Sequence, residues 1–125
     1  MKRSSDTYIL TKEMQWEELG GGVSRKFLGY DNQIMMVQVK FDKDAEGAPH
    51  AHFHTQATYV VSGKFEFVID GVKQVVSAGD GVYIEPNLLH SAVCLEEGML
   101  IDTFAPVRED FLDGGAVSYF GSKED

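Results

Sequence analysis

The chain has 125 residues, a formal net charge of -9 and one cysteine, Cys94. This length suits one domain. The acidic balance disfavours nucleic acid and anionic membrane surfaces as partners. One cysteine rules out an internal disulfide framework and fits a reducing compartment. Because the N-terminus has no apolar run of signal-peptide length and no segment could span a bilayer, we expect a soluble cytoplasmic protein.

The first part of the chain gives weak structural signals. Residues 1–20 are polar with a few apolar anchors, chiefly Trp16 and Leu19. Residues 12–19 are a weak helical candidate, too short to build a helical fold. The run of three glycines at 20–22 predicts a turn.

Short strands separated by turn residues are predicted after this turn. Residues 33–41 alternate between apolar and polar side chains, with Met35 and Val37 among those on the apolar face. Asp70-Gly71 is a strong hairpin signal. A further weak helical candidate covers residues 108–112. Evenly spaced strands of this kind indicate an all-β sandwich or barrel. The predicted strands cover residues 33–41, 58–63, 64–69, 72–76, 81–84, 90–95 and 98–104.

Three of the four histidines lie in the five-residue segment HAHFH at 50–54. Alternate side chains of a strand share a face, so His50 and His52 can reach one cation. Gln56 has the same parity and could supply an amide oxygen, and His90 could come from another strand. Imidazole suits zinc, nickel, copper or iron. On this spacing alone, histidines that merely titrate in a polar loop are an equally good interpretation.

The surrounding residues resemble the two motifs of the small cupins. The first motif is HxH, then glutamate, then glycine six residues later, and here it reads His50, His52, Gln56 and Gly63. The second motif, G-D-x-x-x-I-P-x-G-x-x-H, is similar to GDGVYIEPNLLH at 79–90. The resemblance implies one cupin domain over residues 1–125, an all-β jelly-roll barrel (double-stranded β-helix) with its core at about 15–113 and a solvated tail at 114–125.

Two departures from these motifs matter. Asn87 replaces the glycine of the second motif, and asparagine is the next-best residue for a left-handed turn. Gln56 replaces the usual glutamate and removes a negative charge, so a bound metal would keep its full positive charge and attract an anionic oxygen more strongly. The first motif has no ligand at the position of His54. We expect His54 to lie beside the ligands, to contact substrate or to be exposed.

A closer resemblance, covering about residues 15–113, is to the pectin-degradation cupins of the KdgF type. It is carried by residues 16–41, the histidine cluster with Gln56, and residues 100–112. It implies an enzyme that converts 4,5-unsaturated monouronates, released by pectate and alginate lyases, to their linear keto form. It also implies a homodimer, to which the apolar residues Tyr8, Ile9, Leu10 and Trp16 could contribute. The expected cofactor is one divalent transition metal (nickel, zinc, iron or manganese) on His50, His52, Gln56 and His90.

An acid that could move protons lies in the segment LIDTF. Leu100, Asp102 and Phe104 share one strand face, and Asp102 is the only charged residue there. Burial on an inner face would raise the pKa of Asp102. The resemblance implies that Asp102 is catalytic, that Phe104 shapes the pocket and that Arg108 binds the substrate carboxylate. Alternatively, Asp102 lies on the outer face, and Arg108 only pairs with its acidic neighbours.

Two other functions remain open at this stage. An iron or copper dioxygenase also uses the cupin site, although many such enzymes keep the glutamate that is absent here. A non-catalytic metal-binding or sugar-binding cupin is not excluded by any residue. No helix-turn-helix pattern accompanies the barrel, which argues against a DNA-binding regulator.

Overall fold

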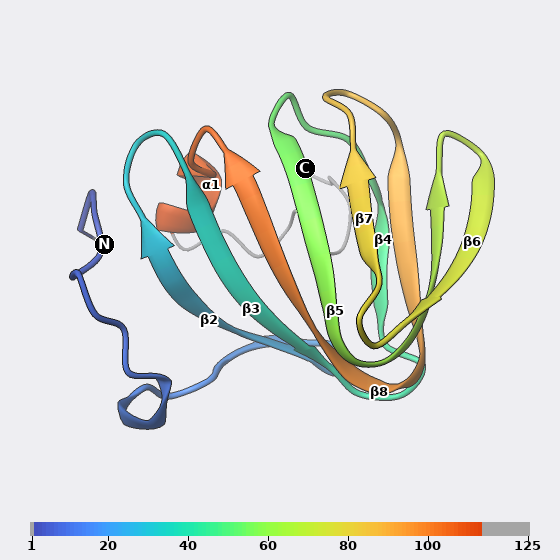
Figure 1. Ribbon diagram of the computed structural model, residues 1–125, viewed down its shortest axis with the longest axis horizontal. Coiled ribbons are helices and arrows are strands. Elements are labelled where there is room, and N and C mark those ends of the chain that lie inside the picture. The colour runs from blue at the N-terminus through green and yellow to red at the C-terminus, as the bar shows by residue number, and fades with distance from the viewer. Residues whose placement is uncertain (1, 114–125) are drawn as a thin grey trace.

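The computed structural model describes residues 2–113, and the predicted tail at 114–125 lies outside this range. The described chain is an antiparallel β-structure (Figure 1), as the sequence predicts. The strands are β1 (Glu17–Gly20), β2 (Val23–Tyr30), β3 (Met35–Phe41), β4 (Glu46–His50), β5 (Thr55–Ile69), β6 (Val72–Ser77), β7 (Gly81–Ile84) and β8 (His90–Ala105). One 3-10 turn (Thr11–Glu13) precedes them, and the short helix α1 (Glu109–Leu112) follows.

Strands β5 and β8 are longer than predicted, and each replaces two predicted strands. The prediction that one strand ends at Gly63 and another at 96–98 is wrong, because both strands continue through these positions with shifts in register. Gly63 has φ +83°, and a Cβ there would lie 2.6 Å from the carbonyl oxygen of Glu96. The strand bends at Gly63, where the backbones of β5 and β8 approach closely. The positive φ and the lack of room for a Cβ together require glycine at this position.

β5 and β8 pair along nearly their whole length, on both sides of the bend, and form the centre of the barrel (Figure 1). The first half of β5 pairs with the second half of β8, between β7 and β3. The second half of β5 pairs with the first half of β8, between β6 and β4. Alternate side chains point inward and form the core, so the predicted apolar face of β3 is confirmed. Its members are Met35, Val37, Val39 and Phe41.

Local predictions near the turns have mixed outcomes. The glycine turn between β1 and β2 is confirmed, as are the Asp70-Gly71 hairpin and the left-handed conformation of Asn87, which has φ 69°. The short helix predicted near the end of the described chain is present as α1. The helix considered at 12–19 is wrong, because only a 3-10 turn forms and β1 begins at Glu17. The described residues contain no helix long and apolar enough to cross a membrane.

Candidate metal centre

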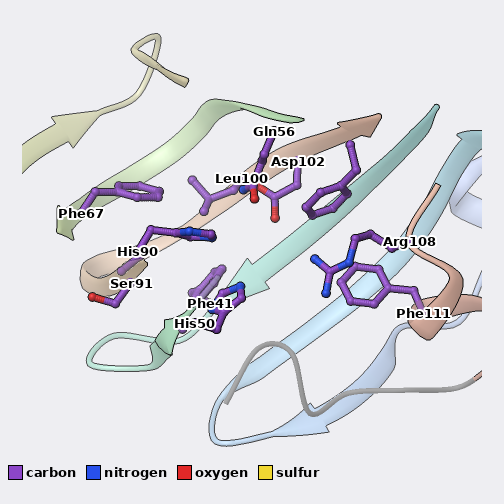
Figure 2. Close-up of a pocket in the computed structure, with 13 residues that line it drawn as sticks. Phe41, His50, Gln56, Phe67, His90, Ser91, Leu100, Asp102, Arg108 and Phe111 are labelled. Atoms are coloured by element: carbon purple, nitrogen blue, oxygen red, sulfur yellow. The ribbon is translucent and has the colours of Figure 1, made fainter. Parts of the chain in front are cut away.

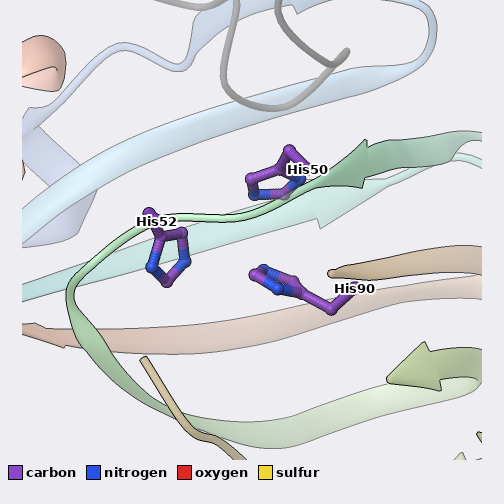
Figure 3. Close-up of side chains that lie close together, drawn as sticks. All are labelled: His50, His52 and His90. Atoms are coloured by element: carbon purple, nitrogen blue, oxygen red, sulfur yellow. The ribbon is translucent and has the colours of Figure 1, made fainter. Parts of the chain in front are cut away.

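Two histidines that are close in sequence, His50 and His52, meet His90 from a distant part of the chain (Figure 3). His50 ends β4 and His90 begins β8, and these two residues are paired across the strands. His52 lies in the loop between β4 and β5, not on a strand as the parity argument assumed. One nitrogen of each ring lies within 4.8 Å of the others, so the three histidines form a candidate metal site.

Backbone carbonyl groups fix how these imidazoles are oriented. Nδ1 of His50 lies 2.8 Å from the oxygen of Ala48, and Nδ1 of His90 lies 2.9 Å from the oxygen of Leu88. A carbonyl oxygen only accepts, so each Nδ1 carries the hydrogen and each Nε2 keeps its lone pair. Nε2 of His90 is buried and has no hydrogen-bond partner among the described residues. Backbone orientation of one ring nitrogen, leaving the other free, is typical of metal-ligating histidines.

His52 and Gln56 supply an independent test of whether a cation fits here. Nδ1 of His52 lies 3.2 Å from the oxygen of His54, and its Nε2 lies 2.9 Å from Oε1 of Gln56. A neutral imidazole has only one N–H, so one of these contacts sets two lone pairs against each other. A cation shared by Nε2 and Oε1 would remove that repulsion. The four predicted ligands therefore fit a transition metal, although their ligand roles remain predictions.

Burial keeps the histidines neutral. Loss of solvation lowers the pKa of His50 and of His52 to about 4, and the positive charge of Arg108 acts in the same direction. The pKa of His90 is also lowered, mainly by burial. Because a metal needs the unprotonated imidazole, the fold prepares these side chains for binding at neutral pH.

Asp102 lies on the inner face of β8, so the alternative of an outer-face position is excluded. Burial raises its pKa to about 6, against the opposing effects of Thr58, Arg108 and Gln56. The hydroxyl of Thr58 donates to Oδ1 of Asp102 at 2.7 Å, and Nε2 of Gln56 donates to the same oxygen at 3.4 Å. A carboxyl group with this pKa can both give and take a proton near neutral pH.

Arg108 is buried between the barrel and α1 rather than solvated. Its guanidinium lies 4.2 Å from the ring centroid of Phe111 and 5.0 Å from that of Phe104. It also donates to both carboxylate oxygens of Asp110, at 3.0 and 2.8 Å. The pairing considered as an alternative is thus present, but the residue is only 3% exposed and lines the same pocket as His50 and His90.

A pocket inside the barrel brings most of the predicted site residues together (Figure 2). Its polar lining includes His50, Gln56, His90, Asp102 and Arg108. Its apolar lining includes Phe41, Phe67, Leu100, Phe104 and Phe111. Apolar walls with a few convergent polar groups are typical of small-molecule sites.

His54 is buried, so the expectation that it could be exposed is wrong. It is not part of the three-histidine group. Its Nε2 lies 3.2 Å from the oxygen of Val107, on the segment that carries Arg108. Of the earlier expectations, a position beside the ligands fits best.

Sequence reasoning missed Thr58 and Phe111. Thr58 shares the parity of Gln56 on one strand, which was a usable signal, but its partner Asp102 lies on another strand. Phe111 was noted only as part of a short helix. Its contact with Arg108 is local, but its contact with Phe104 depends on how α1 packs against the barrel, which no local pattern reveals.

Comparisons with known proteins identify the family of this chain. Residues 37–103 match the model of the cupin domain family. The chain is 48% identical over 107 residues to the pectin degradation protein KdgF of Dickeya dadantii (strain 3937), covering 84% of this chain and 97% of that protein.

Solved structures give the same result. An RmlC-like cupin from Shewanella frigidimarina NCIMB 400 superposes with a TM-score of 0.86 at 44% identity, covering 88% of this chain and 99% of that one. KdgF from Halomonas sp. superposes with a TM-score of 0.82 at 37% identity, covering 86% and 99%.

The antiparallel barrel and the histidine group at its end define a cupin with a candidate metal centre. The chain therefore belongs to the cupin family and, within it, to the KdgF-type pectin-degradation cupins.

Proposed function

We propose that this protein is a metal-dependent enzyme that converts 4,5-unsaturated monouronates, derived from pectin or alginate, to their linear keto form. The similarity to KdgF proteins supports this proposal. The observation that carries it is the cavity, which joins candidate metal ligands, a buried acid and a buried arginine. These three elements match an anionic substrate whose conversion requires proton movement.

The proposed reaction is an isomerisation. The bond between the anomeric carbon and the ring oxygen breaks, and the anomeric hydroxyl loses its proton to give an aldehyde. The released ring oxygen becomes an enol or enolate. One proton added to the neighbouring vinylic carbon converts this group to a ketone. The proton lost and the proton gained balance, so no oxidant or reductant is needed.

The residues of the cavity fit the demands of this reaction. His50, His52, Gln56 and His90 would hold a divalent metal, which would supply Lewis acidity toward substrate oxygens. Asp102, with its pKa near 6, exchanges the proton with the substrate. Arg108 holds the substrate carboxylate, and a guanidinium can do so with two parallel hydrogen bonds. Phe104 supports Arg108 from within the barrel.

An absorbance assay tests this proposal. The conjugated double bond of unsaturated galacturonate or mannuronate absorbs ultraviolet light, and ketonisation removes the absorbance. Purified protein loaded in turn with nickel, zinc, iron or manganese should accelerate this loss, and elemental analysis should find one metal per chain. Asp102→Ala should lower kcat by roughly a hundredfold or more while the metal content stays the same.

Two outcomes would contradict the proposal in different ways. Turnover that consumes dissolved oxygen would favour a dioxygenase. Saturable binding of the uronate, with the sugar recovered unchanged, would favour a non-catalytic binding cupin. Loss of metal from the Asp102→Ala variant would instead assign Asp102 to the metal.

We also propose that the protein acts in the cytoplasm as a homodimer. The outer face of the barrel supports the dimer, because Met36 on β3, Tyr59 on β5 and Tyr83 on β7 are exposed on one sheet, in which β8 lies between β3 and β5. A second copy of this face would cover these side chains. Light scattering after size exclusion should give the mass of two chains. Tyr59→Glu should give one chain, and Val72→Glu on β6 should leave the dimer intact.

A further inference from the structure

His54 has no role in the proposed reaction, yet it is one of the buried polar residues of the protein. Its side chain is 5% exposed. The ring stacks on Phe53 with centroids 4.0 Å apart and meets the ring of Phe104 nearly edge-on at 6.4 Å. Burial of an imidazole costs free energy unless its polar atoms are used. Its Nδ1 has no hydrogen-bond partner among the described residues, so the contact of Nε2 is what offsets the burial of this ring.

His54 makes one hydrogen bond through its ring and another through its backbone oxygen. Its Nε2 lies 3.2 Å from the backbone oxygen of Val107, so Nε2 carries the hydrogen and donates. Its own backbone oxygen lies 3.2 Å from Nδ1 of His52. One residue thus touches both a candidate metal ligand and the backbone next to Arg108.

The segment that carries Arg108 has few other backbone attachments. The amide of Val107 donates to the oxygen of Asn32 at 3.4 Å, which is a long hydrogen bond. The first turn of α1 is closed on the oxygen of Arg108, by Phe111 at 3.0 Å and Leu112 at 3.3 Å. A shift of Val107 would therefore move Arg108 and the start of α1 together.

We propose that His54 is a positioning residue that ties the Val107–Arg108 backbone to the metal-binding loop. This assignment rests on the proposed function. It keeps the guanidinium that holds the substrate carboxylate at a fixed distance from the ligand His52. Misplacement of a binding group by a fraction of an ångström weakens binding of the substrate even when the group itself remains.

Two substitutions distinguish the contribution of the His54 ring from that of its N–H donor. His54→Phe keeps a stacking ring and loses the donor. His54→Gln loses the ring but places an amide N–H at about the reach of Nε2. The first variant leaves the oxygen of Val107 without its donor, and the second should restore that hydrogen bond.

Hydrogen exchange tests the attachment without any need for turnover. In His54→Phe, the amides of Phe111, Leu112 and Asp113 should exchange about tenfold faster, while those of the β5–β6 hairpin should not change. His54→Gln should exchange at nearly the wild-type rate. Unchanged exchange near α1 would overturn the proposal, as would equal acceleration in the hairpin.

Kinetics then test the consequence for binding. His54→Phe should raise KM for the unsaturated uronate about tenfold, with kcat within about twofold of wild type and one metal per chain. In an Arg108→Ala background, the same substitution should have no further effect on KM. A lower kcat at unchanged KM would overturn the proposal. If the wild-type protein does not turn over the uronate, the proposed function fails, and the exchange measurement still decides the role of His54.

Discussion

The side-chain oxygen of Gln56 lies 2.9 Å from Nε2 of His52, so the amide oxygen faces the candidate metal ligands. The nitrogen at the other end of the same amide donates to Thr58 at 3.0 Å and toward Asp102 at 3.4 Å. One uncharged side chain therefore joins the candidate metal ligands to the candidate acid. A glutamate here could not donate to either partner and would face Asp102 with a second negative charge.

We expect Gln56→Glu to strengthen metal binding and weaken catalysis. The added carboxylate should raise zinc affinity at least about tenfold, because it neutralises part of the metal charge. Repulsion should raise the pKa of Asp102 further, and kcat should fall by about tenfold or more. Chelator competition and the absorbance assay measure the two effects. Gln33→Glu, at an exposed site, is the matched control, and unchanged zinc affinity in Gln56→Glu would contradict its assignment as a ligand.

Thr58 should orient Asp102 through its hydroxyl. Thr58→Val removes the 2.7 Å hydrogen bond to the carboxylate, and kcat should fall about tenfold while zinc affinity stays the same. Thr58→Ser should recover most of the activity. Thr103→Val changes a residue on the neighbouring strand outside the cavity and should leave kcat unchanged. Equal losses in the serine and valine variants would show that packing, rather than the hydroxyl, matters.

The buried carboxyl of Asp102 should make stability depend on pH in the metal-free protein. Its pKa is raised from 3.8 to about 6, so the folded chain holds a proton that the unfolded chain has released between these values. Its contribution to the free energy of unfolding is present below about pH 4 and is lost as pH rises through 6. By this linkage, Asp102→Asn should be more stable than wild type by on the order of 3 kcal/mol at pH 7.5, and the difference should shrink toward pH 4.

Urea unfolding of chelator-treated wild-type and Asp102→Asn proteins at several pH values measures this difference. Other titrating groups are common to both proteins and largely cancel in the comparison. A stability difference that stays constant across this range would contradict the raised pKa of Asp102.

Metal affinity should depend weakly on pH above about pH 5. Burial lowers the pKa of His50 and His52 to about 4, so few protons compete with the metal until the pH approaches that value. An imidazole with the ordinary pKa near 6.5 would lose about thirtyfold in affinity at pH 5. Zinc competition titrations at pH 7 and pH 5 measure the dependence. A loss of that size for each histidine would show that the rings are solvated in the metal-free protein.

The fold and much of the site could be predicted from local patterns. Alternation on β3, the Asp70-Gly71 turn and the shared face of Leu100, Asp102 and Phe104 all follow from side-chain periodicity or turn chemistry. The extent of β5 and β8 could not be predicted in this way. A glycine at a strand bend and a glycine at a turn have the same local signature, and only strand pairing distinguishes them.

The sequence by itself determined the residue types of the site: imidazoles and an amide with cupin spacing, one acid in an apolar strand, and an arginine shortly after it. Only the tertiary structure decided what each of them contacts. It pairs Thr58 with Asp102, packs Phe104 against Phe111 and directs His54 to Val107. Each of these contacts joins residues from different elements, and such contacts depend on how strands and loops pack, which short-range periodicity does not encode.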